Sequence, residues 1–353
     1  MKLQKLRQKI DALDQSIIDL LNIRAKITID IGKIKVQSGK SIYAPERESQ
    51  VLRKLASFTK GPLSRQALEA IYREIMSAGL ALEKKLVIAY MGPQASFSNL
   101  AALKKFVAQV EYLACKNISD VFLEVERGSA DYGVVPVENS IEGAVSHTLD
   151  VFAESDLKIC SQVILDVAHN LLANCSKARI KRVYSNPQVF GQCRIWLQEN
   201  LPCAELVDVS STTHAAEIAA KEKNSAAIAS LLASKVYGLR VFASNIEDSP
   251  HNITRFFVIG KDVPSRTGED KTSVLFSIKD KVGALYDMLT PFKKYGSNLT
   301  KIESRPSKKK AWEYYFYIDI CGHQLDKKVK IALNELDKKC MFMKILGSYP
   351  VGE

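Results

Sequence analysis

The segment Ile246–Phe256, with the sequence IEDSPHNITRF, places a hydroxyl beside a guanidinium. Thr254 and Arg255 stand directly before the apolar run Phe256–Ile259. Such a run predicts a buried strand, so the pair would lie at the mouth of a core. A hydroxyl and a guanidinium together can hold a small anionic substrate, because the guanidinium pairs with carboxylates. On pattern alone, a strand with one surface ion pair explains the segment about as well.

A second set of charged side chains lies on the N-terminal segment. Apolar residues recur in steps of three and four from Leu3 to Ile34, which predicts one long amphipathic helix ending near Gly39. Arg24 occupies a position in this apolar seam, where a guanidinium is costly unless it is paired or binds a ligand. Lys35 follows about three turns later at nearly the same azimuth. Cations on a helix face suit the binding of a dicarboxylate.

Two shorter helices should follow the long one. Pro45 opens the first of them, Gly61-Pro62 breaks the chain, and Ser64 can cap the second, which carries Glu83 near its end. Two short helices cannot bury the long apolar seam of the first. The sequence therefore predicts an intertwined helical dimer.

The central segment alternates expected strands and helices, which predicts α/β architecture. Polar clusters follow several of the expected strands, at Gly92–Ser98, Glu138–Ser140, Ser185–Gln188 and Ser210–Thr213. Open α/β folds bind ligands beyond the carboxyl ends of their strands. Helix capping explains any one cluster equally well, but their recurrence favours a binding site.

The last segment predicts a small α+β domain after a linker at Gly260–Asp270. The expected elements are a strand at Thr272–Lys279, a helix at Gly283–Tyr295, strands at Thr300–Glu303 and Trp312–Cys321, a helix at Leu325–Leu336 and a strand at Phe342–Tyr349. This βαββαβ order is typical of the ferredoxin-like fold, which serves many functions.

Length and composition limit the classes of protein. The chain has 353 residues, 46% of them apolar, which predicts two or three domains. Its net charge of +11 is dispersed apart from Ser307–Lys310, an expected exposed loop, so we expect no nucleic-acid partner. No apolar run is long enough for a membrane span, and the first residues lack a signal-peptide pattern. Seven cysteines without CxxC pairs indicate reduced thiols and no zinc site, so we expect a cytoplasmic protein.

Several strings resemble known families. Thr254-Arg255-Phe256 with the preceding NIEDSPHN, and Pro136–Ser140, resemble signatures of prephenate dehydratases. The helical segment is similar to the all-helical chorismate mutases. Gly283–Tyr286 and Asn298–Pro306 resemble signatures of the phenylalanine-binding ACT domain. With these parts in the order mutase, dehydratase and ACT domain, the chain resembles the bifunctional chorismate mutase–prephenate dehydratases of phenylalanine biosynthesis.

The resemblance implies a multidomain chain. Residues 1–84 would form an all-α mutase domain that dimerises. Residues 86–262 would form an α/β dehydratase domain whose two subdomains resemble periplasmic binding proteins, with a cleft between them. Residues 270–353 would form an α+β, ferredoxin-like ACT domain. The implied ligands are chorismate, prephenate and the effector phenylalanine, with no cofactor and no metal, in a homo-oligomer that is a dimer or a tetramer.

The resemblance also assigns the mutase residues. The site would contain Arg24, Lys35, Arg47, Glu48 and Glu83, with Arg7 supplied by the partner chain. Glu83 would lie near the breaking ether oxygen, where many relatives carry Gln. An ionised carboxylate would repel that oxygen, so Glu83 must be protonated to donate a hydrogen bond. Ala44 and Gly79 depart from the pattern of the relatives and leave a weakly active or inactive module open.

In the dehydratase domain, Thr254 would hydrogen-bond the departing hydroxyl. The other candidates are Glu138 as an acid, Arg255 as a carboxylate clamp or structural support, and Asn139, Ser185, Gln192, Ser211 and Thr212 as polar contacts. His251 is expected to be a turn residue. The candidate phenylalanine contacts are Gly283, Ala284, Leu285, Asn298, Glu303 and Ser304.

Two other functions remain open. The chain can be a monofunctional dehydratase whose mutase-like module only dimerises, which an assay with chorismate distinguishes. It can also be a non-catalytic amino-acid sensor on a two-lobed binding fold. A sensor would bind phenylalanine without converting prephenate, and the intact Thr254-Arg255-Phe256 string argues against it.

Overall fold

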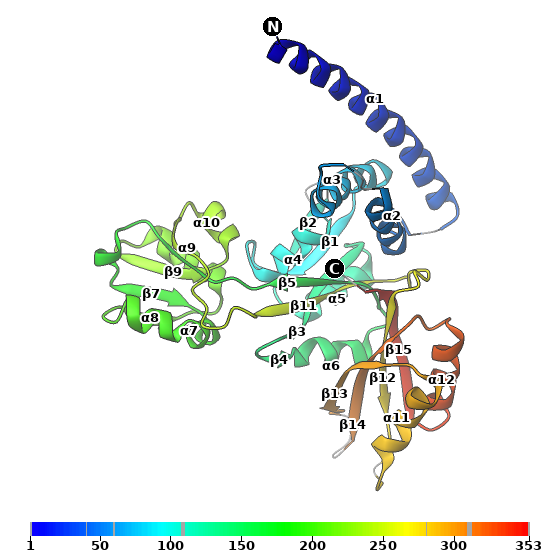
Figure 1. Ribbon diagram of the computed structural model, residues 1–353. Coiled ribbons are helices and arrows are strands. Elements are labelled where there is room, and N and C mark those ends of the chain that lie inside the picture. Colours follow the sequence, from blue (N-terminus) through cyan, green and yellow to red (C-terminus); the bar gives the residue numbers. More distant parts are fainter. Residues whose placement is uncertain are drawn as a thin grey trace. The chain divides into compact units, whose positions relative to one another are not determined.

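The computed structural model describes residues 2–39, 41–58, 61–106, 110–279, 281–308 and 313–351. The chain divides into two compact units (Figure 1). The first unit comprises residues 1–87 and 106–111, and the second comprises residues 88–105 and 112–353. In the described ranges, no helix has the length and apolar character needed to cross a membrane.

The first unit is built on three helices. They are α1 at Lys2–Gln37, α2 at Pro45–Phe58 and α3 at Arg65–Glu83. Ser64 caps α3 by accepting a hydrogen bond from the backbone N–H of Ala67, as predicted. Gly32 of α1 lets α1 approach α3 closely, because a Cβ at Gly32 would lie 2.9 Å from Cβ of Glu83. The three predicted helices are thus confirmed.

The apolar seam of α1 is largely uncovered in the single chain. Leu3, Leu13 and Leu20 are each more than 60% exposed, and Gly32 is the buried residue of α1. A continuous apolar stripe on a helix is normally covered by another element or by another chain. As predicted, the two shorter helices α2 and α3 leave much of the apolar seam of α1 uncovered.

The first sheet of the second unit forms one lobe of an α/β region. Its strands have the order β2-β1-β3-β11-β5, with β4 paired to β3. The strands are β1 at Val87–Met91, β2 at Glu111–Cys115, β3 at Tyr132–Asn139, β4 at Gly143–Ala144, β5 at Lys158–Asp166 and β11 at Ile253–Gly260. The associated helices are α4 at Phe97–Phe106, α5 at Ile118–Arg127 and α6 at Ser146–Glu154. The interior strand β11 runs antiparallel to both of its neighbours, β3 and β5.

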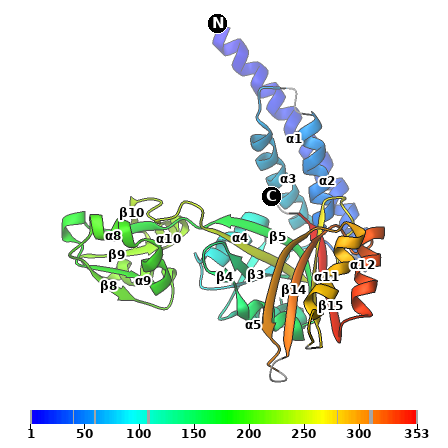
Figure 2. The same cartoon turned by 60° about the horizontal axis from the view of Figure 1, so that its bottom comes forward.

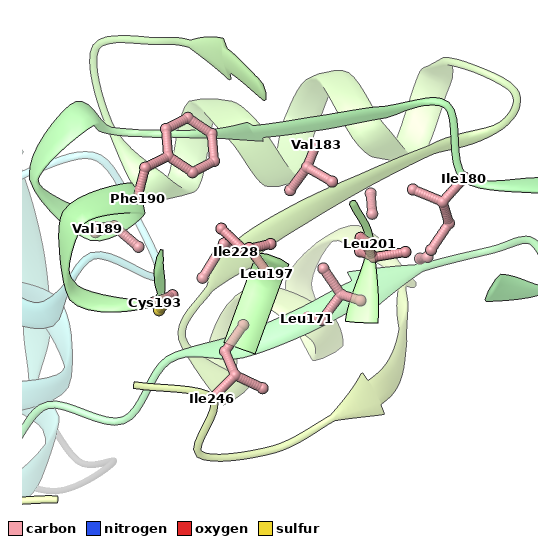
Figure 3. Packing of buried hydrophobic residues seen from close by; sticks show 12 residues of the cluster. Leu171, Ile180, Val183, Val189, Phe190, Cys193, Leu197, Leu201, Ile228 and Ile246 are labelled. Carbon is pink, nitrogen blue, oxygen red and sulfur yellow. The ribbon is translucent and has the colours of Figure 1, made fainter. Parts of the chain in front are cut away.

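The second lobe has its own five-stranded sheet in the order β10-β6-β9-β7-β8. Its strands are β6 at Asn170–Ala173, β7 at Arg182–Ser185, β8 at Glu205–Asp208, β9 at Ser225–Ala229 and β10 at Arg240–Ala243. Its helices are α7 at Pro187–Gln192, α8 at Arg194–Asn200, α9 at Thr212–Lys221 and α10 at Leu231–Tyr237, with a short 3₁₀ turn at Lys177–Arg179. Figure 3 shows the core of this lobe, in which Val183, Leu197 and Ile228 are buried together.

The chain crosses between the two lobes twice. Residues 167–169 connect β5 to β6, and residues 244–252 connect β10 back to β11. Figure 1 shows both connections side by side at the junction of the lobes. A two-lobed α/β region with a double crossover places the ends of β3 and β11 beside the second lobe, which agrees with the predicted dehydratase architecture.

The C-terminal sheet has the order β13-β14-β12-β15. Figure 2 shows β14 and β15 together with the helices α11 and α12 of this domain. Its elements are β12 at Asp270–Ser277, α11 at Ala284–Tyr295, β13 at Leu299–Pro306, β14 at Tyr314–Cys321, α12 at Lys327–Asp337 and β15 at Phe342–Pro350. The predicted βαββαβ order is confirmed, with β13 longer than expected. Trp312 of the predicted third strand, and Lys309 and Lys310 of the predicted loop, lie outside the described residues.

Candidate active sites

The two lobes of the α/β region line a cleft with a volume of about 590 Å³. The N-terminal ends of α4 and α9 contribute polar residues to its wall, including Ser96 and Ser211. Helix N-termini carry partial positive charge and unpaired N–H groups, which suit anionic ligands. Of the residues predicted for this site, the cleft brings together Asn139, Gln192, Ser211, Thr212 and Thr254.

A turn of the backbone fixes the side-chain amide of Asn139. Its Oδ1 accepts hydrogen bonds from the backbone N–H groups of Ile141 at 2.9 Å and Glu142 at 3.0 Å. The Nδ2 group must therefore face the other way. It donates to Oγ1 of Thr254 and to Oδ1 of Asn252, both at 2.8 Å.

This arrangement determines what the Thr254 hydroxyl can do. Its oxygen already accepts a hydrogen bond from Asn139, and Thr254 is only 9% exposed. Among the described residues, no protein acceptor faces its own proton. Thr254 is thus set up as a hydrogen-bond donor in the wall of the cleft.

Three predicted dehydratase residues lie away from the cleft lining. Ser185 is fully buried and donates to the carbonyl oxygen of Ile228, which supports the sheet of the second lobe. Glu138 and Arg255 are neighbours of Asn139 and Thr254 on the paired strands β3 and β11. Because successive side chains of a strand point to opposite faces, Glu138 and Arg255 face the C-terminal sheet instead.

Arg255 is held by a buried polar network that reaches the C-terminal sheet. Its guanidinium lies 2.5 Å from Oδ2 of Asp319 on β14, 2.8 Å from Oε1 of Gln162 and 2.9 Å from the hydroxyl of Tyr349 on β15. Burial lowers the pKa of Arg255, but Tyr349, Asp319 and Glu138 outweigh burial and hold this pKa above its ordinary value. Arg255 therefore remains a cation and ties the strand of Thr254 to the C-terminal sheet.

Glu138 makes a second link of the same kind. Its Oε2 lies 2.9 Å from Nζ of Lys301 on β13, and 3.8 Å from Nη1 of Arg255. The roles predicted for Glu138 as an acid and for Arg255 as a clamp remain predictions. The geometry agrees with the other role considered for Arg255, that of structural support.

The cleft lining includes residues to which the sequence interpretation gave no role, among them His169, Asn252 and Glu142. His169 is 1% exposed, and its Nε2 lies 2.8 Å from Oε1 of Gln192. The adjacent pair His169-Asn170 at the start of a buried strand was a usable signal. His251, which was expected to be a turn residue, lies in an exposed turn.

In the helical unit, α1 and α3 bring three predicted mutase residues to their contact. Nζ of Lys35 lies 2.8 Å from Oε2 of Glu83 and 2.6 Å from the carbonyl oxygen of Ile42. Nη1 of Arg24 lies 3.3 Å from the carbonyl oxygen of Ile75. A Cβ on Gly79 would lie 3.3 Å from the same Nη1, so Gly79 leaves room for the Arg24 guanidinium.

The remaining mutase candidates are more open. Glu48 accepts a hydrogen bond from the hydroxyl of Tyr43 at 3.4 Å, and Arg47 is exposed on α2. Arg7 lies on the exposed N-terminal part of α1, 17 residues before Arg24, or about 25 Å along the helix. Arg7 is too distant to serve the same site in one chain, which agrees with its expected place in a partner chain.

The start of α11 borders a depression of about 430 Å³. Gly283, Ala284 and Leu285 line it, together with Tyr314 and Phe316 of β14. The other predicted phenylalanine contacts lie elsewhere. Asn298 and Ser304 are exposed, and Glu303 shares its face of β13 with Lys301 and Arg305.

Family models match the chain in three consecutive parts. They are chorismate mutase type II at residues 6–84, prephenate dehydratase at residues 88–264 and the ACT domain at residues 272–338.

Curated relatives match almost end to end. The bifunctional chorismate mutase/prephenate dehydratase of Aquifex aeolicus is 49% identical over 99% of this chain and 98% of its own length. The protein of the same name from Stutzerimonas stutzeri is 44% identical with the same coverage. A crystal structure of prephenate dehydratase in complex with L-Phe from Arthrobacter aurescens is 34% identical. It covers 75% of this chain and 90% of its own, with a TM-score of 0.71.

Both enzymatic domains and the C-terminal domain are therefore present in the predicted order. Residues 6–84 match the chorismate mutase model, which a chain with a dehydratase domain alone would not do. The predicted classes, an isomerase and a carbon–oxygen lyase, are confirmed. The chain belongs to the family of bifunctional chorismate mutase/prephenate dehydratases.

Proposed function

We propose that the chain converts chorismate to prephenate at the α1–α3 contact and prephenate to phenylpyruvate in the cleft between the lobes. The observation that carries the second step is the Thr254 hydroxyl, which accepts from Asn139 and presents its own proton to the cleft. An assay that starts from chorismate and follows phenylpyruvate tests the proposal. The functional domains would be residues 1–84, 86–262 and 270–353, close to the three family matches.

The dehydratase step requires groups that bind the two carboxylates of prephenate and a group that stabilises its departing hydroxyl. Loss of carbon dioxide releases the electron pair of the breaking C–C bond into the ring, and the ring C–OH bond breaks as the ring becomes aromatic. The hydroxyl leaves as water after taking up a proton. Thr254 stabilises the departing oxygen by a hydrogen bond, because an alcohol is too weak an acid to give up its proton outright near neutral pH.

The other cleft residues hold the substrate. Ser211 and Thr212 stand at the N-terminus of α9, where a carboxylate of the substrate meets N–H groups and partial positive charge. Gln192 and Asn139 orient the hydrogen bonds around Thr254. Ser185 supports the sheet below the cleft through its bond to Ile228.

The mutase step needs no nucleophile, since a Claisen rearrangement only rearranges bonds within chorismate. The compact conformer of chorismate would be bound by Arg24, Lys35, Arg47 and Glu48, together with Arg7 from a second chain. The exposed apolar seam of α1 supports this partner, because a second copy would cover it. The active form is thus proposed to be a homodimer or a larger homo-oligomer in the cytoplasm.

Glu83→Gln is expected to keep or raise the mutase rate. The glutamine amide can donate a hydrogen bond to the ether oxygen of chorismate, whereas a Glu83 carboxylate that pairs with Lys35 can only accept. Initial rates of chorismate loss by the wild type and the variant at the same pH measure the difference. A variant rate far below that of the wild type would refute the role of Glu83.

Phenylalanine is proposed as the feedback inhibitor of the dehydratase step. The solved relative from Arthrobacter aurescens contains L-Phe, and the depression at Gly283–Leu285 is lined by apolar and aromatic side chains of the kind that hold a phenyl ring. Asn298, Glu303 and Ser304, which do not line this depression, remain predicted contacts of the effector.

Titration with phenylalanine should therefore give saturable binding together with slower phenylpyruvate formation. The two effects are thermodynamically linked, so prephenate should in turn weaken phenylalanine binding. Calorimetry and the dehydratase assay on the same preparation measure them. Binding without any loss of dehydratase rate, or no binding at all, contradicts the proposed regulation.

A further inference from the structure

His169 occupies the first crossover between the lobes and lines the cleft. Its side chain is 1% exposed, and the ring of Phe97 packs against it edge to face, with the two ring centroids 5.6 Å apart. Its backbone N–H donates to Oε2 of Glu247 at 2.8 Å, which fixes the backbone of the crossover. The ring is therefore packed against Phe97 and its backbone is fixed by Glu247.

The hydrogen bonds around the cleft determine which ring nitrogen carries the proton. The Asn139 amide is fixed by backbone donors, so Oδ1 of Asn252 accepts from Asn139. The Nδ2 group of Asn252 then donates to Oε1 of Gln192 at 2.9 Å. Because Oε1 is an amide oxygen and can only accept, the Nε2 atom of His169 at 2.8 Å must be the donor.

The same ring is neutral. Burial lowers the pKa of His169, while Gln192 and Glu247 oppose this effect only in part. Nδ1 is buried and has no hydrogen-bond partner among the described residues, so a proton there would lack a protein acceptor. The lowered pKa favours the neutral ring, and the absence of a partner at Nδ1 in the described part of the chain selects the tautomer that carries its proton on Nε2.

We propose that His169 is a positioning residue of the dehydratase step. Its Nε2–H holds the Gln192 amide in one orientation. Gln192 thereby fixes the amides of Asn252 and Asn139, which direct the Thr254 hydroxyl towards the substrate. This inference rests on the proposed dehydratase function of the cleft. Without the His169 donor, Gln192 is free to turn its amide, Asn252 loses a fixed acceptor and the order of donors and acceptors up to Thr254 is lost.

Two amide variants test the inference. His169→Gln places an amide N–H near the position of Nε2, whereas His169→Asn places one near Nδ1 and cannot reach Gln192. Both replace the ring by a smaller polar side chain. A role in packing alone would therefore make the two variants similar.

We expect His169→Asn to lower kcat for prephenate roughly a hundredfold, since misplacement of a catalytic group by about 1 Å has this effect. Its KM should change much less, because the departing hydroxyl develops its charge only in the transition state. His169→Gln should recover most of the lost kcat. The mutase rate of the same preparations and their thermal unfolding transitions show whether the protein is intact.

His323 supplies a matched control, because it is also 1% exposed but lies in the C-terminal domain, where Nε2 faces the carbonyl oxygen of Pro264. His323→Asn and His323→Gln should both leave kcat for prephenate near the wild-type value. Equal loss of kcat in His169→Asn and His169→Gln overturns the positioning role of His169. A wild-type chain that does not convert prephenate would overturn the proposed function itself, which is a separate result.

Discussion

Thr254→Val should abolish phenylpyruvate formation while the chain continues to consume chorismate, so that prephenate accumulates. Valine has nearly the shape of threonine and fits the strand, but it removes the one hydroxyl that Asn139 orients towards the cleft. A hydrogen-bond or proton-transfer group at the reacting atom contributes roughly a hundredfold to ten-thousandfold in rate, and a loss in this range is expected for kcat. Quenched samples analysed for chorismate, prephenate and phenylpyruvate measure all three species.

Two further variants make this test specific. Thr254→Ser keeps the hydroxyl and should retain much of the dehydratase rate. Thr272→Val removes a fully buried hydroxyl from β12 of the C-terminal sheet and should have little effect on kcat. Phenylpyruvate formation by Thr254→Val at a rate close to that of the wild type would exclude the hydroxyl from the reaction.

Arg255→Met should destabilise the second unit strongly. The substitution leaves Asp319, which is 4% exposed, without the guanidinium that lies 2.5 Å from its carboxylate. Removal of one partner from a buried ion pair costs about 3–5 kcal/mol, because an uncompensated charge remains buried. Thermal unfolding followed by tyrosine fluorescence should show a lower transition temperature for this unit, while the mutase rate at moderate temperature persists.

The double variant Arg255→Met/Asp319→Leu provides the control for this prediction. It removes both charges, and apolar replacements of buried ion pairs are often neutral for stability. We therefore expect the double variant to regain much of the transition temperature lost by Arg255→Met. A double variant less stable than Arg255→Met would show that the two side chains do not act as a buried pair.

The Arg255 network also offers a route from the C-terminal domain to the dehydratase cleft. Thr254 and Asn139 face the cleft, and their chain neighbours Arg255 and Glu138 face Asp319 and Lys301 of the C-terminal sheet. A shift of that sheet would therefore act on the same two strands that carry Asn139 and Thr254. This geometry supports regulation of dehydration by an effector bound at the start of α11.

Much of the fold was predictable because local patterns and packing agree. The seam from Leu3 to Ile34 predicted α1, the cap at Ser64 predicted the start of α3, and the βαββαβ order of the last segment is present. Polar clusters after buried strands predicted the cleft, where Asn139, Gln192, Ser211 and Thr254 meet. In each case the deciding information lies in a pattern along one continuous segment of the chain.

The sequence could not reveal which of two adjacent polar residues on a strand faces the cleft and which faces the C-terminal domain. Thr254-Arg255 suggested a joint grip on one substrate, yet strand alternation sends the two side chains to opposite faces. His169 escaped notice because its function depends on Gln192 and Asn252, which are distant in the sequence and meet only at the crossover.

The central claim is that one chain carries out both steps at two separate sites. The most direct measurement supplies the purified chain with chorismate alone and follows prephenate and phenylpyruvate over time. The account predicts that chorismate disappears, prephenate rises transiently and phenylpyruvate becomes the final product. Chorismate that stays unchanged, or prephenate that accumulates without conversion by the wild-type chain, would contradict it.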